Sequence, residues 1–340
     1  MKNIVTIGGG TGSFVLLSGL KKYPVNLSAI VSMADDGGST GVLRDELGVL
    51  PPGDIRQCLV ALSDSSDEMR RLMSYRFDKG GLKGHSFGNL LLSALEKLNG
   101  NFLKGLEEAV RILNVKGEVI PVTSSNANLY LELLNGTTLK GEAEINGNFT
   151  IEKQGIKKIF LKPRARANPK AVERIHNADI IIIGPGNFYC SIIPNLLVDG
   201  IAEAIRKSRA TVVFNCNLVN KKGHTEHFTL DDYVDTVNSY LGAKRVDFAT
   251  FNVRKPSDEL VKKYDRKREF LVPFEKESRS RRDYKVILTD LLSDALLQYG
   301  KSDALAKHRA FIRHDEEKLA KIIMFVSEFE ENKDIIRKII

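Results

Sequence analysis

The spacing of apolar residues near the N-terminus predicts a strand, a turn and a helix. Residues 3–7 form a short β-branched run, and residues 13–22 carry apolar side chains at near-helical spacing. A second strand-like run covers residues 27–33 and leads into the polar, glycine-rich loop 34–41. Strands joined in this way form a parallel βαβ unit, which places both loops at the carboxyl edge of a sheet. Doubly wound folds bind their ligands at that edge.

Helical patterns dominate up to about residue 113, and the pattern then changes twice. Residues 119–162 contain strand-like segments with Asn-Gly dipeptides at 135–136 and 146–147, which favour tight hairpins. Residues 179–183 form an unbroken apolar run, typical of a strand buried on both faces. Strand and helix patterns alternate after it: helices at 194–207, 231–240 and 316–325, and strands at 211–215 and 247–251.

These patterns predict an α/β fold that is Rossmann-like and doubly wound, with a mostly parallel sheet and an antiparallel β insertion. We expect residues 1–118 to form an N-terminal nucleotide-binding half and residues 119–162 to form the insertion. Residues 163–340 then form the C-terminal half, which completes the same sheet and ligand site. Within the first half, Asp54 and Gln57 have the spacing of an N-terminal helix cap.

Composition narrows the class of protein. The 340 residues are 42% apolar and 28% charged, which is ordinary for a folded globular chain. The three cysteines lie far apart without a CxxC pair, so the sequence predicts reduced thiols rather than disulfides or a zinc site. No run approaches the roughly 18 apolar residues of a membrane helix. We therefore expect a cytoplasmic protein that does not insert into a membrane.

Much of the net charge of +8 comes from residues 254–285. The basic stretches at 264–268 and 279–282 lack the interleaved aromatic residues of a nucleic-acid stacking platform. They predict a solvated face or a clamp on a ligand's diphosphate, with no nucleic-acid partner. Close by in sequence, His224 and His227 lack the HExxH spacing of a zinc-binding helix, so we interpret their segment as a surface loop.

The glycine-rich turn after the first strand is the strongest candidate for ligand binding. Gly9, Gly10, Thr11 and Gly12 lie where a strand leads into a helix, so backbone N–H groups and the positive end of the helix dipole converge on an anion. The turn matches neither the dinucleotide fingerprint, because Ser13 replaces glycine or alanine, nor a P-loop, which needs a lysine. The alternative is a purely structural tight turn.

Two adjacent acids, Asp35 and Asp36, follow the second strand. A carboxylate there binds a ribose hydroxyl in dinucleotide enzymes, whereas a pair beside glycines suggests a phosphate bound through Mg²⁺. Neighbouring residues of an extended chain point opposite ways, so we expect only one of them to face a ligand. Both are metal ligands only if the protein depends on Mg²⁺, and the alternative is a solvated loop.

A second phosphate-type loop follows the apolar strand at 179–183. It contains Gly184, Pro185, Gly186 and Asn187, with Ser191 as a nearby hydroxyl donor and Pro194 suited to open the next helix. A further candidate segment is 84–89, where His85 or Asn89 is expected to contact a ligand or to transfer a proton. The alternative for that segment is a helix cap formed by Ser86 or Asn89.

Several long motifs together resemble the gluconeogenesis factor (YvcK) family, within the superfamily of the 2-phospho-L-lactate transferase CofD. The resemblance covers nearly the whole chain. It is carried by the segments GGGTG (8–12), ADDGGS (34–39), LRDELG (43–48), LPPGDIR (50–56), GHSFGNL (84–90) and IGPG (183–186), with Ser191 and PNL (194–196).

The resemblance implies a protein that binds a UDP-sugar, notably UDP-N-acetylglucosamine, and supports cell shape and cell-wall synthesis on gluconeogenic carbon sources. By motif match, the diphosphate lies between residues 10–12 and 184–186, with Asp36 nearby. Tyr264 resembles a family tyrosine that contacts the sugar nucleotide, and Arg313 resembles a family arginine at the same ligand.

The resemblance brings no firm reaction, so we expect a regulatory binding protein with no required cofactor rather than an enzyme. The partners expected are UDP-N-acetylglucosamine, unidentified cell-wall synthesis proteins and further copies of the chain. A CofD-like, Mg²⁺-dependent phosphotransferase is the alternative, and a nicotinamide-dependent dehydrogenase is a third, weaker interpretation.

Overall fold

The computed structural model describes residues 1–146, 148–275, 282–294 and 312–331. Its main sheet has seven strands in the order β10-β9-β8-β7-β1-β2-β3, and every neighbouring pair is parallel. The strands are β1 (Lys2–Gly8), β2 (Val25–Val31), β3 (Glu118–Pro121), β7 (Ile180–Ile183), β8 (Thr211–Asn215), β9 (Phe248–Asn252) and β10 (Lys285–Thr289). The predicted doubly wound, mostly parallel α/β fold is confirmed.

The strand order reverses between β1 and β7. The chain builds the sheet outward from β1 through β2 to β3, then returns to pair β7 with the other side of β1 and continues outward to β10. This reversal is the topological switch point at which doubly wound sheets bind ligands, because the loops that follow the two strands leave in opposite directions. The order of the strands therefore marks the loops after β1 and β7.

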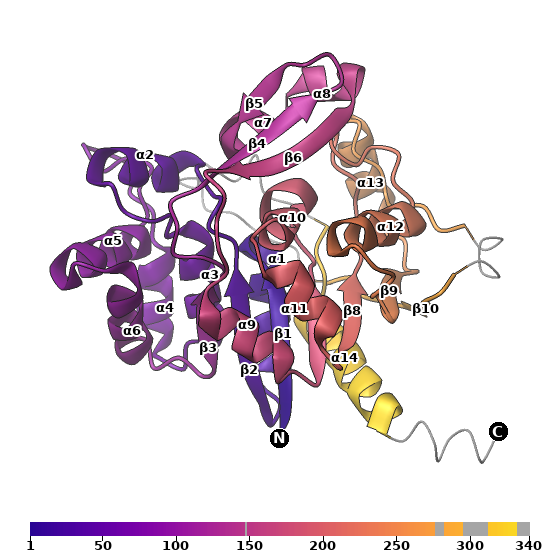
Figure 1. Ribbon diagram of the computed structural model, residues 1–340, viewed down its shortest axis with the longest axis horizontal. Helices are drawn as coiled ribbons and strands as arrows, with labels where there is room; N and C mark the ends of the chain where they lie inside the picture. The colour runs from indigo at the N-terminus through magenta and orange to yellow at the C-terminus, as the bar shows by residue number, and fades with distance from the viewer. Residues whose placement is uncertain (147, 276–281, 295–311, 332–340) are drawn as a thin grey trace.

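The helices pack in two groups against this sheet (Figure 1). Helix α1 packs on α3 and α14, whereas α11 packs on α9 and α12. The helices of the main body are α1 (Gly10–Leu20), α2 (Gly38–Leu47), α3 (Gly53–Leu62), α4 (Asp67–Ser74), α5 (Phe87–Asn99), α6 (Phe102–Ile112), α9 (Pro169–His176), α10 (Ile193–Leu196), α11 (Ile201–Lys207), α12 (Leu230–Leu241), α13 (Asp258–Asp265) and α14 (Glu316–Glu331), with a π-helix, η1 (Phe188–Ile192).

The core lies between these helices and the central strands. All four isoleucines of β7 are buried, which confirms the strand buried on both faces that the apolar run predicted. Leu16, Leu17 and Leu20 bury the inner side of α1 in the same cluster. Helix α1 is thereby fixed against the sheet, and its N-terminus is fixed with it.

The small sheet lies above the carboxyl edge of the main sheet (Figure 1). Its three antiparallel strands have the order β5-β4-β6 and comprise β4 (Asn128–Leu133), β5 (Thr138–Lys140) and β6 (Ile156–Lys162). Two short helices, α7 (Gly141–Ile145) and α8 (Phe149–Gln154), connect β5 to β6. The predicted antiparallel insertion is therefore present, and we use the name insertion for residues 128–162.

Three local predictions in this part of the chain can be compared with the structure. Strand β3 lies almost entirely inside the range predicted for the insertion, yet it pairs in parallel with β2 as the edge of the main sheet, so that boundary is wrong. The hairpin turn predicted at 135–136 is confirmed, because it joins β4 to β5. The second dipeptide lies between α7 and α8 rather than between two strands, and its residue 147 lies outside the described residues.

The helix predicted at 194–207 is interrupted. The segment folds as α10 and α11, and Gly200 precedes α11 as its N-cap with a left-handed φ of 104°. Pro194 lies in the first turn of α10, as its position in the sequence predicted. The edge strand β10 was not predicted, because charged residues precede it and none of its residues is fully buried.

Candidate functional site

The turn after β1 and the loop after β7 are in direct contact at the switch point. A methyl group placed on Gly12 would lie 2.1 Å from the carbonyl oxygen of Pro185, and one on Gly186 would lie 3.5 Å from the carbonyl oxygen of Gly9. Only glycine at position 12 permits this approach. Gly10, with a φ of 66°, opens α1, so free N–H groups of the first helical turn gather here. We call residues 9–12 and 184–187 the paired loops.

Asp54 lies directly under the first of the paired loops. Its Oδ2 would be 2.1 Å from a side chain on Gly9, and its carboxyl group accepts a hydrogen bond from the backbone of Gly10. Burial raises the pKa of Asp54 well above its usual range, and the nearby carboxyl groups of Asp35 and Glu142 raise it further. Sequence reasoning made Asp54 a helix cap, which is wrong: α3 starts at Gly53 without a side-chain cap, and the Asp54 side chain points to the turn.

The adjacent acids Asp35 and Asp36 point to different partners. Oδ1 of Asp35 accepts a hydrogen bond from the N–H of Gly37 at 2.9 Å, and burial raises the pKa of Asp35. Oδ1 of Asp36 accepts one from the N–H of Ala143 in α7 at 3.0 Å. One oxygen of each carboxyl group is therefore engaged by a different backbone N–H. In the part of the chain that the structure describes, no group of three or more histidine, cysteine, aspartate or glutamate side chains has a metal-binding arrangement.

Two asparagines after β8 hold the second of the paired loops. Asn217 donates from Nδ2 to the carbonyl oxygen of Gly186 at 3.0 Å and accepts from the Gly186 N–H at 3.4 Å. Asn215 donates from Nδ2 to the carbonyl oxygen of Gly184 at 3.4 Å. Sequence reasoning missed both residues. The available signal was their position at, or two residues after, the end of the strand predicted at 211–215.

The other predicted residues of the paired loops have defined places. Asn187 donates from Nδ2 to Glu142 Oε1 at 3.2 Å and to Asn146 Oδ1 at 3.0 Å, so the loop is joined to the insertion. Ser191 is buried in η1, and its N–H donates to the carbonyl oxygen of Asn187 at 2.7 Å. Thr11 is exposed, and its hydroxyl donates to Gln57 at 3.5 Å.

Asn89 lies in a separate polar network that joins three helices. Its Oδ1 accepts from Arg56 Nε of α3 at 2.9 Å, and its Nδ2 donates to Ser39 Oγ of α2 at 3.3 Å. The hydroxyl of Ser39 is also 3.1 Å from Nδ1 of His85. Ser86 caps α5 by accepting from the Asn89 N–H, so the helix-cap interpretation is confirmed for Ser86. Both polar ends of the Asn89 side chain are engaged by the protein itself.

Tyr264 lies in a small apolar cluster that contacts the residue before Arg313. The Tyr264 ring is 7% exposed and packs with Leu218, Leu292 and Ile312. Its hydroxyl accepts a hydrogen bond from the N–H of Ile312 at 3.2 Å, and Arg313 is the next residue. Leu218 in turn follows Asn217, so this cluster is connected to the paired loops. Of the predicted basic stretches, residues 279–281 lie outside the described residues.

The surface-loop interpretation of the segment around His224 is wrong for that residue. His224 is buried, its Nε2 lies 2.9 Å from the carbonyl oxygen of Ile145 in α7, and its ring packs on Tyr189. Burial lowers the pKa of His224 to about 4, and the nearby charge of Lys221 adds to this effect. His227 is exposed, as predicted. The segment folds inward because it supports the insertion.

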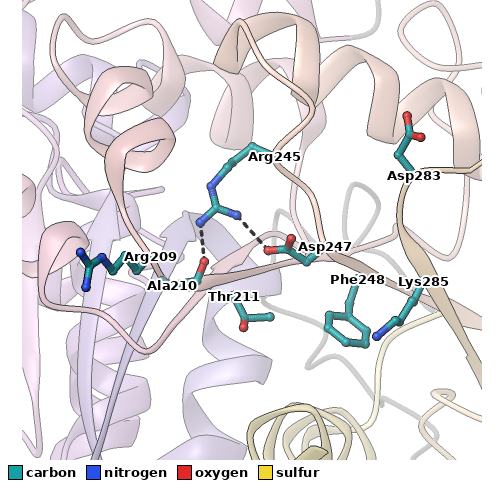
Figure 2. A pocket seen from close by; sticks show the side chains of 8 residues that line it. All are labelled: Arg209, Ala210, Thr211, Arg245, Asp247, Phe248, Asp283 and Lys285. Atoms are coloured by element: carbon teal, nitrogen blue, oxygen red, sulfur yellow. Dashed lines mark hydrogen bonds and ion pairs between the residues drawn. The ribbon is translucent and has the colours of Figure 1, made fainter. Parts of the chain in front are cut away.

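A charged hollow of about 310 Å³ lies at the opposite, amino edge of β8, β9 and β10 (Figure 2). Most of its charged groups have partners within the protein. Arg245 donates to Asp247 Oδ2 at 2.9 Å and to the carbonyl oxygen of Ala210, and Asp283 pairs with Lys244. Lys285 lies 5.0 Å from the centre of the Phe248 ring. These contacts join strand ends, which is a structural role.

The three cysteines are buried and unpaired, in agreement with the predicted reduced thiols. Burial raises the pKa of each of their thiols, so they are poor nucleophiles. Over the described ranges, none of the helices has the length and apolar composition that crossing a membrane requires.

Comparison with known proteins agrees with the fold and the motifs. The sequence pattern of the family described as 2-phospho-L-lactate transferase CofD matches residues 4–292. A gluconeogenesis factor of Bacillus subtilis is 39% identical over 325 residues, which cover 94% of this chain and 96% of that protein. A gluconeogenesis factor of Halalkalibacterium halodurans is 43% identical over 267 residues, covering 77% of this chain and 81% of that one.

A solved structure is also similar to this protein over most of the chain. The crystal structure of a Bacillus halodurans protein has a TM-score of 0.85 and 37% sequence identity, covering 95% of this chain and 99% of that chain. The parallel sheet, the insertion and the paired loops therefore occur in a chain whose sequence and fold both match these proteins over most of their length. The chain belongs to the CofD family and, within it, to the group of proteins named gluconeogenesis factors.

Proposed function

We propose that this protein binds a UDP-sugar, UDP-N-acetylglucosamine in particular, with the diphosphate at the paired loops. The observation that carries the proposal is the contact between the two loops at the switch point, where Gly12 lies against Pro185. The first turn of α1 offers N–H donors and the positive end of the helix dipole to an anion. The second loop closes against this turn, so an anion bound there would lie between the two loops.

The remaining site residues are assigned to the sugar nucleotide on the β8 side of the loops. Asn217 keeps Gly186 in place through two hydrogen bonds, so the second loop is preorganised for the ligand. The segment around Tyr264 and Arg313 is the candidate for contacts with the nucleoside or the sugar, because it is connected to Asn217 through Leu218. Binding here requires no cofactor.

We assign the protein a regulatory role in which the bound UDP-sugar is a signal. In this role it controls cell shape and cell-wall synthesis during growth on gluconeogenic carbon sources. It acts on cell-wall synthesis proteins, and it does so as an assembly of several copies. The names of its relatives support a place in gluconeogenic growth. The nature of the ligand, an amino sugar activated for polymer synthesis, supports the link to the wall.

Calorimetric titration tests the ligand. The full chain is titrated with UDP-N-acetylglucosamine, UDP-glucose, GTP or GDP with Mg²⁺, and NAD. The proposal expects saturable binding of UDP-N-acetylglucosamine with a dissociation constant in the micromolar range or below, and weaker binding of the other nucleotides. Absence of UDP-sugar binding at millimolar ligand would overturn it.

A CofD-like phosphotransferase is the second candidate, favoured by the family description that matches residues 4–292. The same titration separates the two candidates, since the transferase predicts binding of GTP or GDP that depends on Mg²⁺. The divergence of Asp35 and Asp36 towards Gly37 and Ala143 weighs against a metal held by that pair.

A further inference from the structure

The edge that carries the paired loops has a cluster of acidic groups, of which Asp54 is buried and Asp35, Asp36 and Glu142 are half-buried. Asp35, Asp36, Asp54 and Glu142 interact with one another there, and burial together with the Asp35 charge raises the pKa of Glu142 to about 7. Each of these groups that is ionised repels a diphosphate placed beside it, and a nearby cation offsets that repulsion. A positively charged side chain at this place therefore favours binding of the proposed ligand.

Arg56 is a poor candidate for that cation. Its Nε donates to Asn89 at 2.9 Å, and its Nη1 donates to the carbonyl oxygen of Met73 at 3.4 Å. A side chain fixed between α4 and α5 cannot turn to a ligand without breaking these bonds. Its charge instead partly offsets those of Asp35 and Asp54, whose pKa values it lowers.

Lys221 reaches the paired loops from a rigid turn after β8. Its backbone N–H donates to Thr225 Oγ1 at 3.0 Å, and its carbonyl oxygen accepts from the Thr225 N–H at 2.9 Å. Its ammonium group donates to Oδ1 of Asn146 on the insertion. The same oxygen accepts from Nδ2 of Asn187 at 3.0 Å, so the ammonium group and the end of the second phosphate loop share one acceptor atom. Two donors on one acceptor are necessarily close neighbours.

We propose that Lys221 is the cation that binds the diphosphate, and that Asn146 of the insertion holds its ammonium group in the ligand-free protein. The inference rests on the proposed function, because it assigns a contact within that binding site. Binding moves the ammonium group from the Asn146 amide to a phosphate oxygen, where a charge-assisted hydrogen bond is stronger. The insertion loses a contact in this exchange, which couples the ligand to the part of the molecule above the site.

The test is calorimetric titration of the full chain with three probes: UDP-N-acetylglucosamine, UDP and inorganic pyrophosphate. Removing a charged partner from a hydrogen bond costs enough to weaken binding by about tenfold to a hundredfold. We expect Lys221→Gln to show this loss for all three probes, and Lys221→Arg to recover most of the affinity. Lys222→Gln is the matched control, because it removes the same charge one residue further along the turn, and its affinities should stay within about threefold.

The outcomes separate this inference from the proposed function. If the wild type binds UDP-N-acetylglucosamine and Lys221→Gln binds it equally well, Lys221 is not the phosphate ligand and the proposed function stands. If the wild type fails to bind the UDP-sugar but binds pyrophosphate in a Lys221-dependent way, the proposed function fails and the phosphate contact stands. If the wild type binds none of the probes, both fail. A melting temperature of Lys221→Gln near the wild-type value shows that the variant is folded.

Discussion

The two edges of the main sheet use polar side chains in different ways. At the amino edge, charged groups such as Arg245 and Asp247 pair at the start of β9 beside a hollow. At the carboxyl edge, neutral amides hold the backbone loops, and the carboxyl group of Asp54, whose pKa is raised, lies beside the glycine turn. The proposed ligand site is therefore not at the amino edge with its charged hollow. It is at the switch point, where side chains hold the backbone loops in place.

The largest expected effect breaks the contact between the paired loops. Gly12→Ala places a methyl group 2.1 Å from the carbonyl oxygen of Pro185, so the loops must separate. Displacement of both phosphate loops should reduce the affinity for UDP-N-acetylglucosamine by about a hundredfold or more in calorimetry. Gly81→Ala is the control, because nothing lies within 4 Å of its added methyl group. Equal affinity of the Gly12 variant would exclude the paired loops.

The raised pKa of Glu142 gives the carboxyl edge a distinct pH dependence. Its folded pKa of about 7 lies above the ordinary value of 4.5, so the folded state holds this proton more tightly and loses stability as the pH rises from 4.5 to 7. Glu142→Gln retains an acceptor for Asn187 and removes this loss. Chemical denaturation should show the variant about 1–2 kcal/mol more stable than wild type at pH 8, with no difference at pH 4.

Glu132 on the insertion provides the opposite case. Its hydrogen bonds with Lys157 and Lys158 lower the pKa of Glu132, so its contribution is present above pH 4.5 and disappears as the pH falls through the lowered folded pKa. Glu132→Gln should therefore give no gain at pH 8. If both variants gained the same stability at pH 8, burial of Glu142 at the carboxyl edge would not be the cause of its effect on stability.

Removing the hydrogen bonds between Asn217 and Gly186 should have a smaller effect on affinity. Asn217→Ala removes both hydrogen bonds to Gly186, and losing about 1 kcal/mol of preorganisation weakens UDP-sugar binding by about fivefold to tenfold. Asn101→Ala is the matched control: this side chain also makes two hydrogen bonds with the backbone, both accepted from N–H groups at the start of α6. The control should lower the melting temperature without changing affinity. The reverse pattern would contradict the role assigned to Asn217.

The smallest effect is expected at the amino edge. Arg209 is exposed beside the hollow, and Arg209→Gln should leave the affinity for UDP-N-acetylglucosamine within about twofold of wild type. A loss of affinity of tenfold or more in the same titration would mean that the ligand binds at the amino edge, which contradicts the proposed site.

Sequence reasoning located the loops because their signals are local. Glycines at a strand end, an apolar run and a following helix pattern were enough to put residues 9–12 and 184–187 at one edge, where the structure has them in contact. The opposite directions of Asp35 and Asp36 also followed from the alternation of an extended chain. The ligand assigned to this edge stays a prediction.

The missed residues depend on contacts between distant segments. Asp54 has the spacing of a cap, but its side chain bonds to a turn that belongs to another part of the sequence. His224 lies in a polar segment and is nevertheless buried, because the insertion covers it through Ile145. Asn217 acquires its role only when β8 is known to lie beside β7. Such contacts follow from the strand order, which the local pattern does not contain.

Backbone hydrogen exchange with and without UDP-N-acetylglucosamine tests the central claim most directly, because both edges are measured in one experiment. The account predicts that the ligand slows exchange in residues 9–12 and in 184–191, and leaves the amino-edge segments 209–211 and 245–248 unchanged. Protection at the amino edge, with unchanged exchange in the paired loops, would contradict it.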